Sequence, residues 1–239
     1  MNFKSILLAL LVCLFPAIRG ECKQKNHPIQ SLSPLELAKQ SLLRNRQHLD
    51  LINYLIKERG YKSYLEIGVD NGQNFSSVIA ERKIGVDPKT TTPATHKMTS
   101  DDFFKTNRET FDIIFIDGLH LYEQVLRDVE NALACLNPGG VIIMHDCMPT
   151  TEAGQSRTII PGGAWNGDVW KAAAYIRMHL PKVYFCVLDM DWGCGILTPN
   201  STQQLYPAAP IESMDWNYYV KNKIQLLNVM SLEQWVKSR

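Results

Sequence analysis

The sequence lacks the charge pattern and the cysteine spacing that would direct it to nucleic acid or zinc. Its 25 lysines and arginines stand against 24 acids, a formal net charge of +1, with no basic stripe or block of like charge. Nucleic-acid-binding domains usually gather positive charge on one face, so we expect no nucleic-acid partner. The six cysteines include no Cys-x-x-Cys pair, and a zinc cluster is therefore not indicated.

Long apolar runs are also missing, and a short one lies at the N-terminus. Lys4 precedes an uncharged run over residues 6–15, and Pro16 to Gly20 follow it. A transmembrane helix needs about 20 apolar residues. A basic residue, a short apolar run and a small residue in this order are typical of a signal peptide, which would make the protein secreted, lumenal or periplasmic. The alternatives for residues 1–20 are an N-terminal anchor, or an apolar helix docked on a cytoplasmic protein.

The remaining length suits one sizeable domain with an appendage. We expect a helical extension over residues 21–60 and the main domain over residues 61–239. Cys186 and Cys194 flank a turn at residues 189–193. If the turn closes a hairpin centred on Met190, the two thiols face each other and could form a disulfide in an oxidising lumen. The alternative is that both are small apolar strand residues.

Apolar periodicity predicts alternating helices and strands. A capping box at residues 33–36 starts a helix that Gly60 ends. Buried strands are expected at 64–67, 83–86, 111–116 and 141–144, with helices at 75–81, 121–136 and 168–180. A hairpin at 183–188 and 195–198 and helices at 216–229 and 231–236 complete the chain. This order predicts an α/β fold, a Rossmann-like doubly wound sheet that is mostly parallel with a C-terminal antiparallel hairpin strand, and ligands outside the carboxyl ends of its strands.

A glycine turn follows the first expected strand, in the sequence Glu66-Ile67-Gly68-Val69-Asp70-Asn71-Gly72. Glycine lets a ligand approach the backbone closely. The next strand ends at Asp87, at the spacing of an acid that accepts ribose hydroxyls. The turn is not Gly-x-Gly-x-x-Gly, which disfavours an NAD-dependent oxidoreductase. Glu66 suits a positively charged ligand.

Two later motifs complete a family pattern. Residues 111–118 end a strand at Asp117, and Asn137-Pro138-Gly139-Gly140 precedes a strand that ends at His145-Asp146. In this order the motifs resemble class I S-adenosylmethionine (SAM)-dependent methyltransferases over residues 61–198. The resemblance implies that Gly68 and Gly72 line the methionine part of SAM and that Asp87 holds the ribose. Ser100 and Asp101, after an expected third strand, would lie at the adenine. Asp70 departs from the family, which commonly has glycine there.

Asp117 and Asp146 follow adjacent strands and are expected to meet at one edge of the sheet. With His145 they could hold Mg²⁺ or Mn²⁺, which would lower the pKa of an acceptor hydroxyl. The arrangement resembles metal-dependent O-methyltransferases of the catechol and macrolide-sugar types, although those usually have Asn after the second Asp or Glu before it. The alternative is that both acids cap helices. His120 and His145 are candidate general bases, and Asp117 is the acid beside them.

A long loop at residues 147–163 leads into Trp165, Asn166 and Asp168, which are candidate acceptor-binding residues. The sequence therefore predicts a SAM-dependent methyltransferase that O-methylates a small hydroxylated acceptor, such as a sugar, glycan or catechol-like ring. A catalytically silent SAM-fold binding or effector protein is the alternative, because SAM is scarce outside the cytosol. The sequence does not indicate an oligomeric state.

Overall fold

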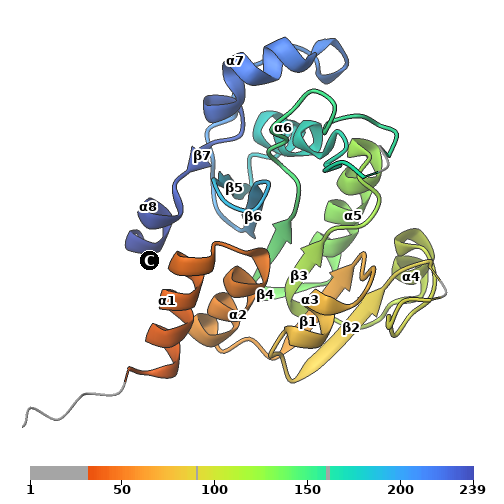
Figure 1. Ribbon diagram of the computed structural model, residues 1–239, viewed down its shortest axis with the longest axis vertical. Coiled ribbons are helices and arrows are strands. Elements are labelled where there is room, and N and C mark those ends of the chain that lie inside the picture. Colours follow the sequence, from red (N-terminus) through yellow and green to blue (C-terminus); the bar gives the residue numbers. More distant parts are fainter. Residues whose placement is uncertain (1–31, 90, 160–161) are drawn as a thin grey trace, which may run out of the picture. The chain divides into compact units, whose positions relative to one another are not determined.

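The computed structural model describes residues 32–89, 91–159 and 162–239 (Figure 1). The expected signal peptide lies outside these residues. Among the described helices, none is both long enough and apolar enough to cross a membrane.

A seven-stranded sheet forms the centre of the described residues, in the order β2-β1-β3-β4-β6-β5-β7. The first four of these strands run parallel, β6 is antiparallel to both β4 and β5, and the two-residue β7 is parallel to β5. This arrangement confirms the predicted α/β fold with an antiparallel hairpin strand. The strands are β1 Ser63–Ile67, β2 Arg82–Val86, β3 Phe111–Ile116, β4 Leu136–Met144, β5 Val183–Leu188, β6 Cys194–Pro199 and β7 Val229–Met230.

Helices cover both faces of the sheet, and two apolar cores result. Alternate strand residues enter opposite cores: Ile114 and Ile116 pack with α5 and α6, whereas Ile113 and Phe115 pack with α1, α2 and α8. The helices are α1 Pro34–Asn45, α2 His48–Arg59, α3 Gln73–Ser77, α4 Ser100–Thr106, α5 Tyr122–Ala134, α6 Val169–His179, α7 Trp216–Leu226 and α8 Leu232–Lys237, with a 3₁₀ turn at Ile211–Ser213.

The prediction of one continuous helix before Gly60 was wrong, because the chain breaks between α1 and α2. Arg46 takes a left-handed conformation, with φ of 56°, and its amide donates to the Leu42 carbonyl. The Asp50 carboxylate accepts hydrogen bonds from the Ser41 hydroxyl and the Asn45 amide across the break. These local polar bonds satisfy groups that a continuous helix would leave to solvent. His48 consequently becomes the first residue of α2.

The expected third strand is also absent from the described residues between β2 and α4. One bridge between Val86 and His96 replaces it. Pro88 and Pro93 lie in this segment, and proline has no amide hydrogen for a strand ladder. The strands expected as fourth and fifth are therefore β3 and β4.

The C-terminal hairpin forms with a register two residues different from the one that would oppose its cysteines. Leu188 pairs with Cys194, and Cys186 pairs with Ile196. The two thiols are consequently not directly opposite, and both are free and buried. The structure therefore supports the apolar strand role rather than the disulfide.

Candidate active site

The turn after β1 brings the backbone very close to the neighbouring strand end. Gly68 has a φ of +88°, and a Cβ atom there would lie 2.1 Å from the Asp117 carbonyl oxygen. The Oδ2 atom of Asp87 accepts hydrogen bonds of 2.9 Å from the amides of Val69 and Asp70. Asp87 thus fastens the turn to the end of β2, a structural role in addition to any ligand contact.

A cavity of about 660 Å³ opens at this edge of the sheet, and we call it the larger cavity. It brings together most residues that the sequence assigned to the cofactor, although Glu66 and Gly72 do not line it. Its volume lies within the ordinary range for small-molecule sites. Its lining includes Gly68, Asp87, Ser100, Asp101, Asp117, His120 and Trp165.

A second cavity of about 490 Å³, the smaller cavity, lies between the glycine turn and the start of α2. It shares Gly68, Asp70 and Asp117 with the larger cavity, so the two spaces meet at the ends of β1 and β3. Its other lining residues are mostly polar. They are Asn45, Gln47, His48, Leu49, Asp50, Glu66, Val69, Asn71, Gln73, Asn74 and Phe115.

Glu66 lines the smaller cavity and is only 1% exposed. Its carboxylate accepts hydrogen bonds from the Tyr64 hydroxyl and, at 2.9 Å, from the Asn74 amide. Burial raises the pKa of Glu66 to about 7, because these two neutral donors compensate only part of the lost hydration. A cationic ligand beside it would favour the ionised form.

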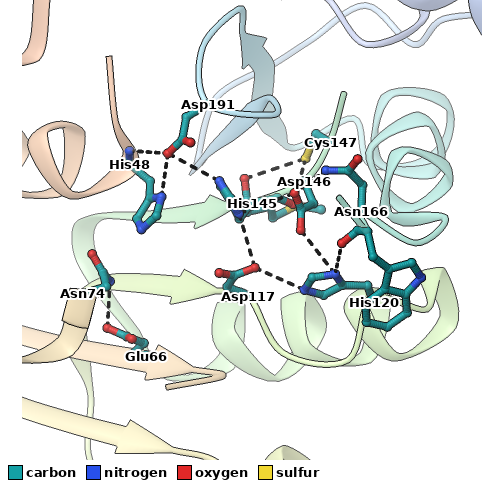
Figure 2. Close-up of polar contacts among 12 residues, drawn as sticks. His48, Glu66, Asn74, Asp117, His120, His145, Asp146, Cys147, Asn166 and Asp191 are labelled. Carbon is teal, nitrogen blue, oxygen red and sulfur yellow. Dashed lines mark hydrogen bonds and ion pairs between the residues drawn. The ribbon is translucent and has the colours of Figure 1, made fainter. Parts of the chain in front are cut away.

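Two aspartates and two histidines gather beside the glycine turn, at the ends of β3 and β4 (Figure 2). His120 lies 3.3 Å from Asp117 and 3.2 Å from Asp146, measured from Nε2 to Oδ1 and from Nδ1 to Oδ2. The Nδ1 atom of His145 lies 3.4 Å from Asp117 Oδ1 and 3.6 Å from Asp146 Oδ1. We call these four side chains the His–Asp cluster. The predicted residues Asp117, His145 and Asp146 therefore meet, and His120 joins them.

Charges within the cluster shift its pKa values. Burial opposes ionisation of Asp117, yet His145 and His120 hold its pKa well below the ordinary value. Burial also opposes the charge of each histidine, but the surrounding aspartates raise the pKa of both, strongly for His145. Burial raises the pKa of Asp146, and the Asp117 charge adds to this rise. The two imidazoles thus favour the ionised form of Asp117, while burial and the Asp117 charge disfavour that of Asp146.

Each imidazole also has a nitrogen near an acceptor outside the cluster, and in His120 this is the same Nδ1 atom that faces Asp146. The Nδ1 atom of His120 is 3.1 Å from the Trp165 carbonyl oxygen. The Nε2 atom of His145 lies 3.5 Å from Asp191 Oδ2, without a hydrogen bond of good geometry. Metal-ligating histidines usually tie their second nitrogen to a carbonyl or carboxylate in this manner.

The helix-capping alternative does not describe Asp117. The Tyr122 amide at the start of α5 donates to Asp168 at 2.9 Å. Asp168 also pairs with Arg157 at 2.5 Å and is 3% exposed. Asn166 is 2% exposed and donates to Asp146 at 2.5 Å. Asn166 and Asp168 line neither cavity, whereas Trp165 lines the larger one and stacks on His120 with ring centroids 4.7 Å apart.

Sequence reasoning missed His48 and Asp191. The position of His48 depends on the helix break at Arg46, and the apolar spacing of residues 33–60 does not reveal this break. Asp191 stands in a polar hairpin turn, where an acid is ordinary. Their place beside His145 is a product of tertiary structure alone (Figure 2).

Comparisons with known proteins agree with this architecture. Residues 53–147 match the family described as a methyltransferase domain. A SAH-bound methyltransferase of Podospora anserina, PaMTH1, is 15% identical with a TM-score of 0.50, and the match covers 80% of this chain and 100% of the other. The O-methyltransferase TomG of Streptomyces achromogenes, in complex with SAM, is 13% identical with a TM-score of 0.50, over 73% of this chain and 93% of the other. No curated protein matches the sequence.

At these identities the solved structures establish the fold alone. Residues 53–147 are similar to a methyltransferase domain, and the described residues have the Rossmann-like fold of the two solved methyltransferases. The predicted fold is confirmed, and the family match agrees with the predicted resemblance.

Proposed function

We propose that the protein transfers the methyl group of SAM to a hydroxyl group of a small acceptor. The observation that carries this proposal is the junction of the two cavities at Gly68 and Asp117, beside the His–Asp cluster. One cavity can then hold the methyl donor and the other the acceptor, with ionisable groups where they meet. The SAH and SAM in the structures of PaMTH1 and TomG support the choice of donor.

The residues that line the larger cavity fit the nucleoside part of SAM. Asp87 is 8% exposed, and the unused lone pairs of its carboxylate can accept ribose hydroxyls. Ser100 and Asp101 begin α4 at the same cavity, which supports our proposal that they bind the adenine. Glu66, on the other side of the turn, would face the cationic end of the ligand. SAM supplies an activated methyl group, and these residues orient it.

The smaller cavity fits an uncharged, hydroxyl-rich acceptor. Five carboxamide side chains line it, and each has both donor and acceptor atoms that match hydroxyl groups. Among the described residues that line it, there is no lysine or arginine that would attract a phosphate or carboxylate. A sugar or glycan is the acceptor class we propose. The carboxamides are Asn45, Gln47, Asn71, Gln73 and Asn74.

The His–Asp cluster fits a divalent cation. Asp117, His120 and Asp146 offer ligand atoms that all lie within 4.8 Å of one another. The Nδ1 atom of His145 lies within 3.6 Å of both acids, so it can be a fourth ligand. Two imidazoles beside two carboxylates suit Mn²⁺ better than Mg²⁺, which prefers oxygen ligands and water. When bound, such an ion lowers the pKa of an acceptor hydroxyl.

The reaction also needs a group that accepts the proton of the acceptor hydroxyl. With no ion present, His120 is the better placed base, because it lines the larger cavity whereas His145 does not. The nearby aspartates, however, raise the pKa of His120, which makes the neutral, proton-accepting form of its ring less available. This constraint favours the ion-assisted reaction, in which both imidazoles serve as ligands.

Calorimetric titration of the full chain with SAM, and separately with NADH, tests the donor. We expect SAM to bind and NADH not to bind. Screening neutral sugars and catechols for methyl transfer, with Mn²⁺ or Mg²⁺ added, then tests the reaction. NADH binding without SAM binding would refute the proposal. SAM binding without transfer to any acceptor would favour the silent binding protein.

A further inference from the structure

Asp191 joins two histidines that come from distant parts of the chain. Its Oδ2 atom accepts hydrogen bonds from the backbone amide of His48 at 2.7 Å and from His48 Nδ1 at 2.6 Å. The same oxygen lies 3.5 Å from Nε2 of His145. Asp191 takes a left-handed backbone conformation, with φ of +44°, in the turn between β5 and β6. Three separate segments therefore converge on one carboxylate oxygen (Figure 2).

His145 has little freedom to reorient. The residue is 9% exposed, and its ring meets the edge of the His48 ring at a centroid distance of 4.7 Å. Its buried Nε2 atom lies on the side of Asp191 and has no hydrogen-bond partner of good geometry among the described residues. With a cation bound between Asp117 and Asp146, a proton kept on Nε2 would leave the Nδ1 lone pair for the ion. The opposite tautomer would direct a proton at the ion and a lone pair at the Asp191 carboxylate, which is unfavourable.

His48 in turn fixes Asp191. Its ring stacks on Phe115 in β3, at a centroid distance of 5.1 Å and an interplanar angle of 15°. Its two hydrogen bonds hold Asp191 Oδ2 from both the backbone and the ring. Burial works against ionisation of Asp191, but His145 and His48 hold its pKa well below the ordinary value, so it remains an acceptor.

We propose that Asp191, held by His48, is a positioning residue that fixes His145 with its Nδ1 lone pair toward Asp117 and Asp146. The inference rests on the proposed function, because the directed lone pair is that of a metal ligand. It adds His48 and Asp191 to the residues that support the site, although neither of them contacts Asp117 or Asp146. The competing use of the same atoms is direct ion binding between His48, His145 and Asp191, whose ligand atoms also lie within 4.8 Å of one another.

The experiment compares Asp191→Asn, His48→Ala and His48→Asn in the full chain. Asp189→Asn is the matched control, because Asp189 stands in the same hairpin turn and is exposed. Calorimetry measures the affinities for Mn²⁺ and for SAM. Nitrogen NMR of the imidazole rings, with Zn²⁺ as a diamagnetic probe, reports which nitrogen of His145 carries a proton and which binds the ion.

We expect His145 to bind the ion through Nδ1 and to keep its proton on Nε2 in the natural protein. Asp191→Asn and His48→Ala should weaken Mn²⁺ binding roughly 10- to 100-fold, the usual cost of losing a group that orients a ligand. His48→Asn should recover most of this loss, because its amide nitrogen takes the place of Nδ1. SAM affinity should stay within about twofold in Asp191→Asn and Asp189→Asn, since neither residue lines either cavity.

Unchanged Mn²⁺ affinity and an unchanged His145 tautomer in Asp191→Asn would overturn the inference. Ion binding through Nε2 of His145 together with His48 would also overturn it, in favour of the competing site. If the natural protein binds no ion, the metal part of the proposed function fails, and the protection of the His145 Nε2 proton from exchange then tests the role of Asp191. Loss of the protected Nε2 proton in Asp191→Asn, but not in Asp189→Asn, would then support it.

Discussion

The Nε2 atom of His120 lies 3.3 Å from the Oδ1 atom of Asp117, and the far side of the same ring reaches Asp146. The ring thus separates two acids that would otherwise repel each other. The Asp146→Asn variant and a chelator together test whether an ion, in addition to the imidazoles, offsets the negative charge of the two acids.

Asp146→Asn should keep the fold and SAM binding, because the side chains are nearly isosteric and the new amide oxygen can still accept from Asn166. Methyl transfer should fall by about 10²-fold or more, the cost typical of losing one charge-stabilising group. Initial rates with the identified acceptor measure this. In the natural protein, a chelator should abolish the activity and Mn²⁺ or Mg²⁺ should restore it. Full activity in chelator would leave a metal-free mechanism with a histidine base.

Asp87→Ala should weaken SAM binding by roughly 2–4 kcal/mol, the range for losing hydrogen bonds to a buried carboxylate. Part of this loss would come from the turn itself, because Asp87 also accepts from the Val69 and Asp70 amides. Calorimetry measures the affinity, with Glu81→Gln as control, since Glu81 is exposed, pairs with Lys62 and lines neither cavity. A folded Asp87→Ala protein with unchanged SAM affinity would remove Asp87 from the donor site.

SAM affinity should depend on pH through Glu66, because burial raises the pKa of Glu66 to about 7 in the ligand-free protein. Below that pH the carboxyl is neutral and cannot attract a cation, so affinity should fall by up to about tenfold per pH unit. Glu66→Gln should bind SAM weakly and with less pH dependence. A series of titrations between pH 6 and 8 tests this, and identical slopes in the two proteins would contradict it.

The raised pKa of Glu66 should also make the ligand-free protein less stable as pH rises, whereas SAM affinity should increase over the same range. The folded pKa of Glu66 lies above its unfolded value of 4.5, so the folded state holds the proton more tightly. Its contribution to stability is complete below pH 4.5 and is lost as pH rises through about 7. Denaturant titrations of the natural protein and of Glu66→Gln should differ in slope over this window, and equal slopes would argue against the shift.

Gly167→Ala should destabilise the loop that holds Trp165 over His120. A Cβ atom on Gly167 would lie 1.8 Å from the His120 carbonyl oxygen, and its φ is +58°. The left-handed backbone and the clash together should cost about 2–5 kcal/mol of unfolding free energy. Gly162→Ala is the control, because Gly162 has a φ of +74° but nothing within 4 Å of its Cβ position. Similar losses in the two variants would show that only backbone strain matters.

We also propose that residues 1–20 are removed on secretion, on the strength of the basic and apolar order of that segment. Mass spectrometry of the natively expressed protein should find a mature form that begins near residue 21. A chain with Met1 intact in the cytosol would show instead that the segment is retained.

The sequence predicted the strands well because buried parallel strands consist of continuous apolar runs, as in residues 111–116. It also placed Asp117 and Asp146 together, because the carboxyl ends of adjacent parallel strands meet at one edge of the sheet. It failed where a local polar bond competes with periodicity, as at Arg46, and where prolines interrupt a weak strand, as between β2 and α4. The partners of His145 could not be predicted, because His48 and Asp191 are distant in sequence and have ordinary local neighbours.

The break between α1 and α2 brings residues from before the region of family similarity into the candidate site. The similarity to a methyltransferase domain starts at residue 53, and the expected boundary between extension and main domain lay at residue 60. Yet the break places His48 against Asp191, and Asn45 and Gln47 in the wall of the smaller cavity. The region before residue 53 thus lies outside the similarity to the domain and contributes side chains to the smaller cavity, where we propose that the acceptor binds. A graft of residues 32–52 onto a related domain would therefore be expected to carry acceptor preference with it.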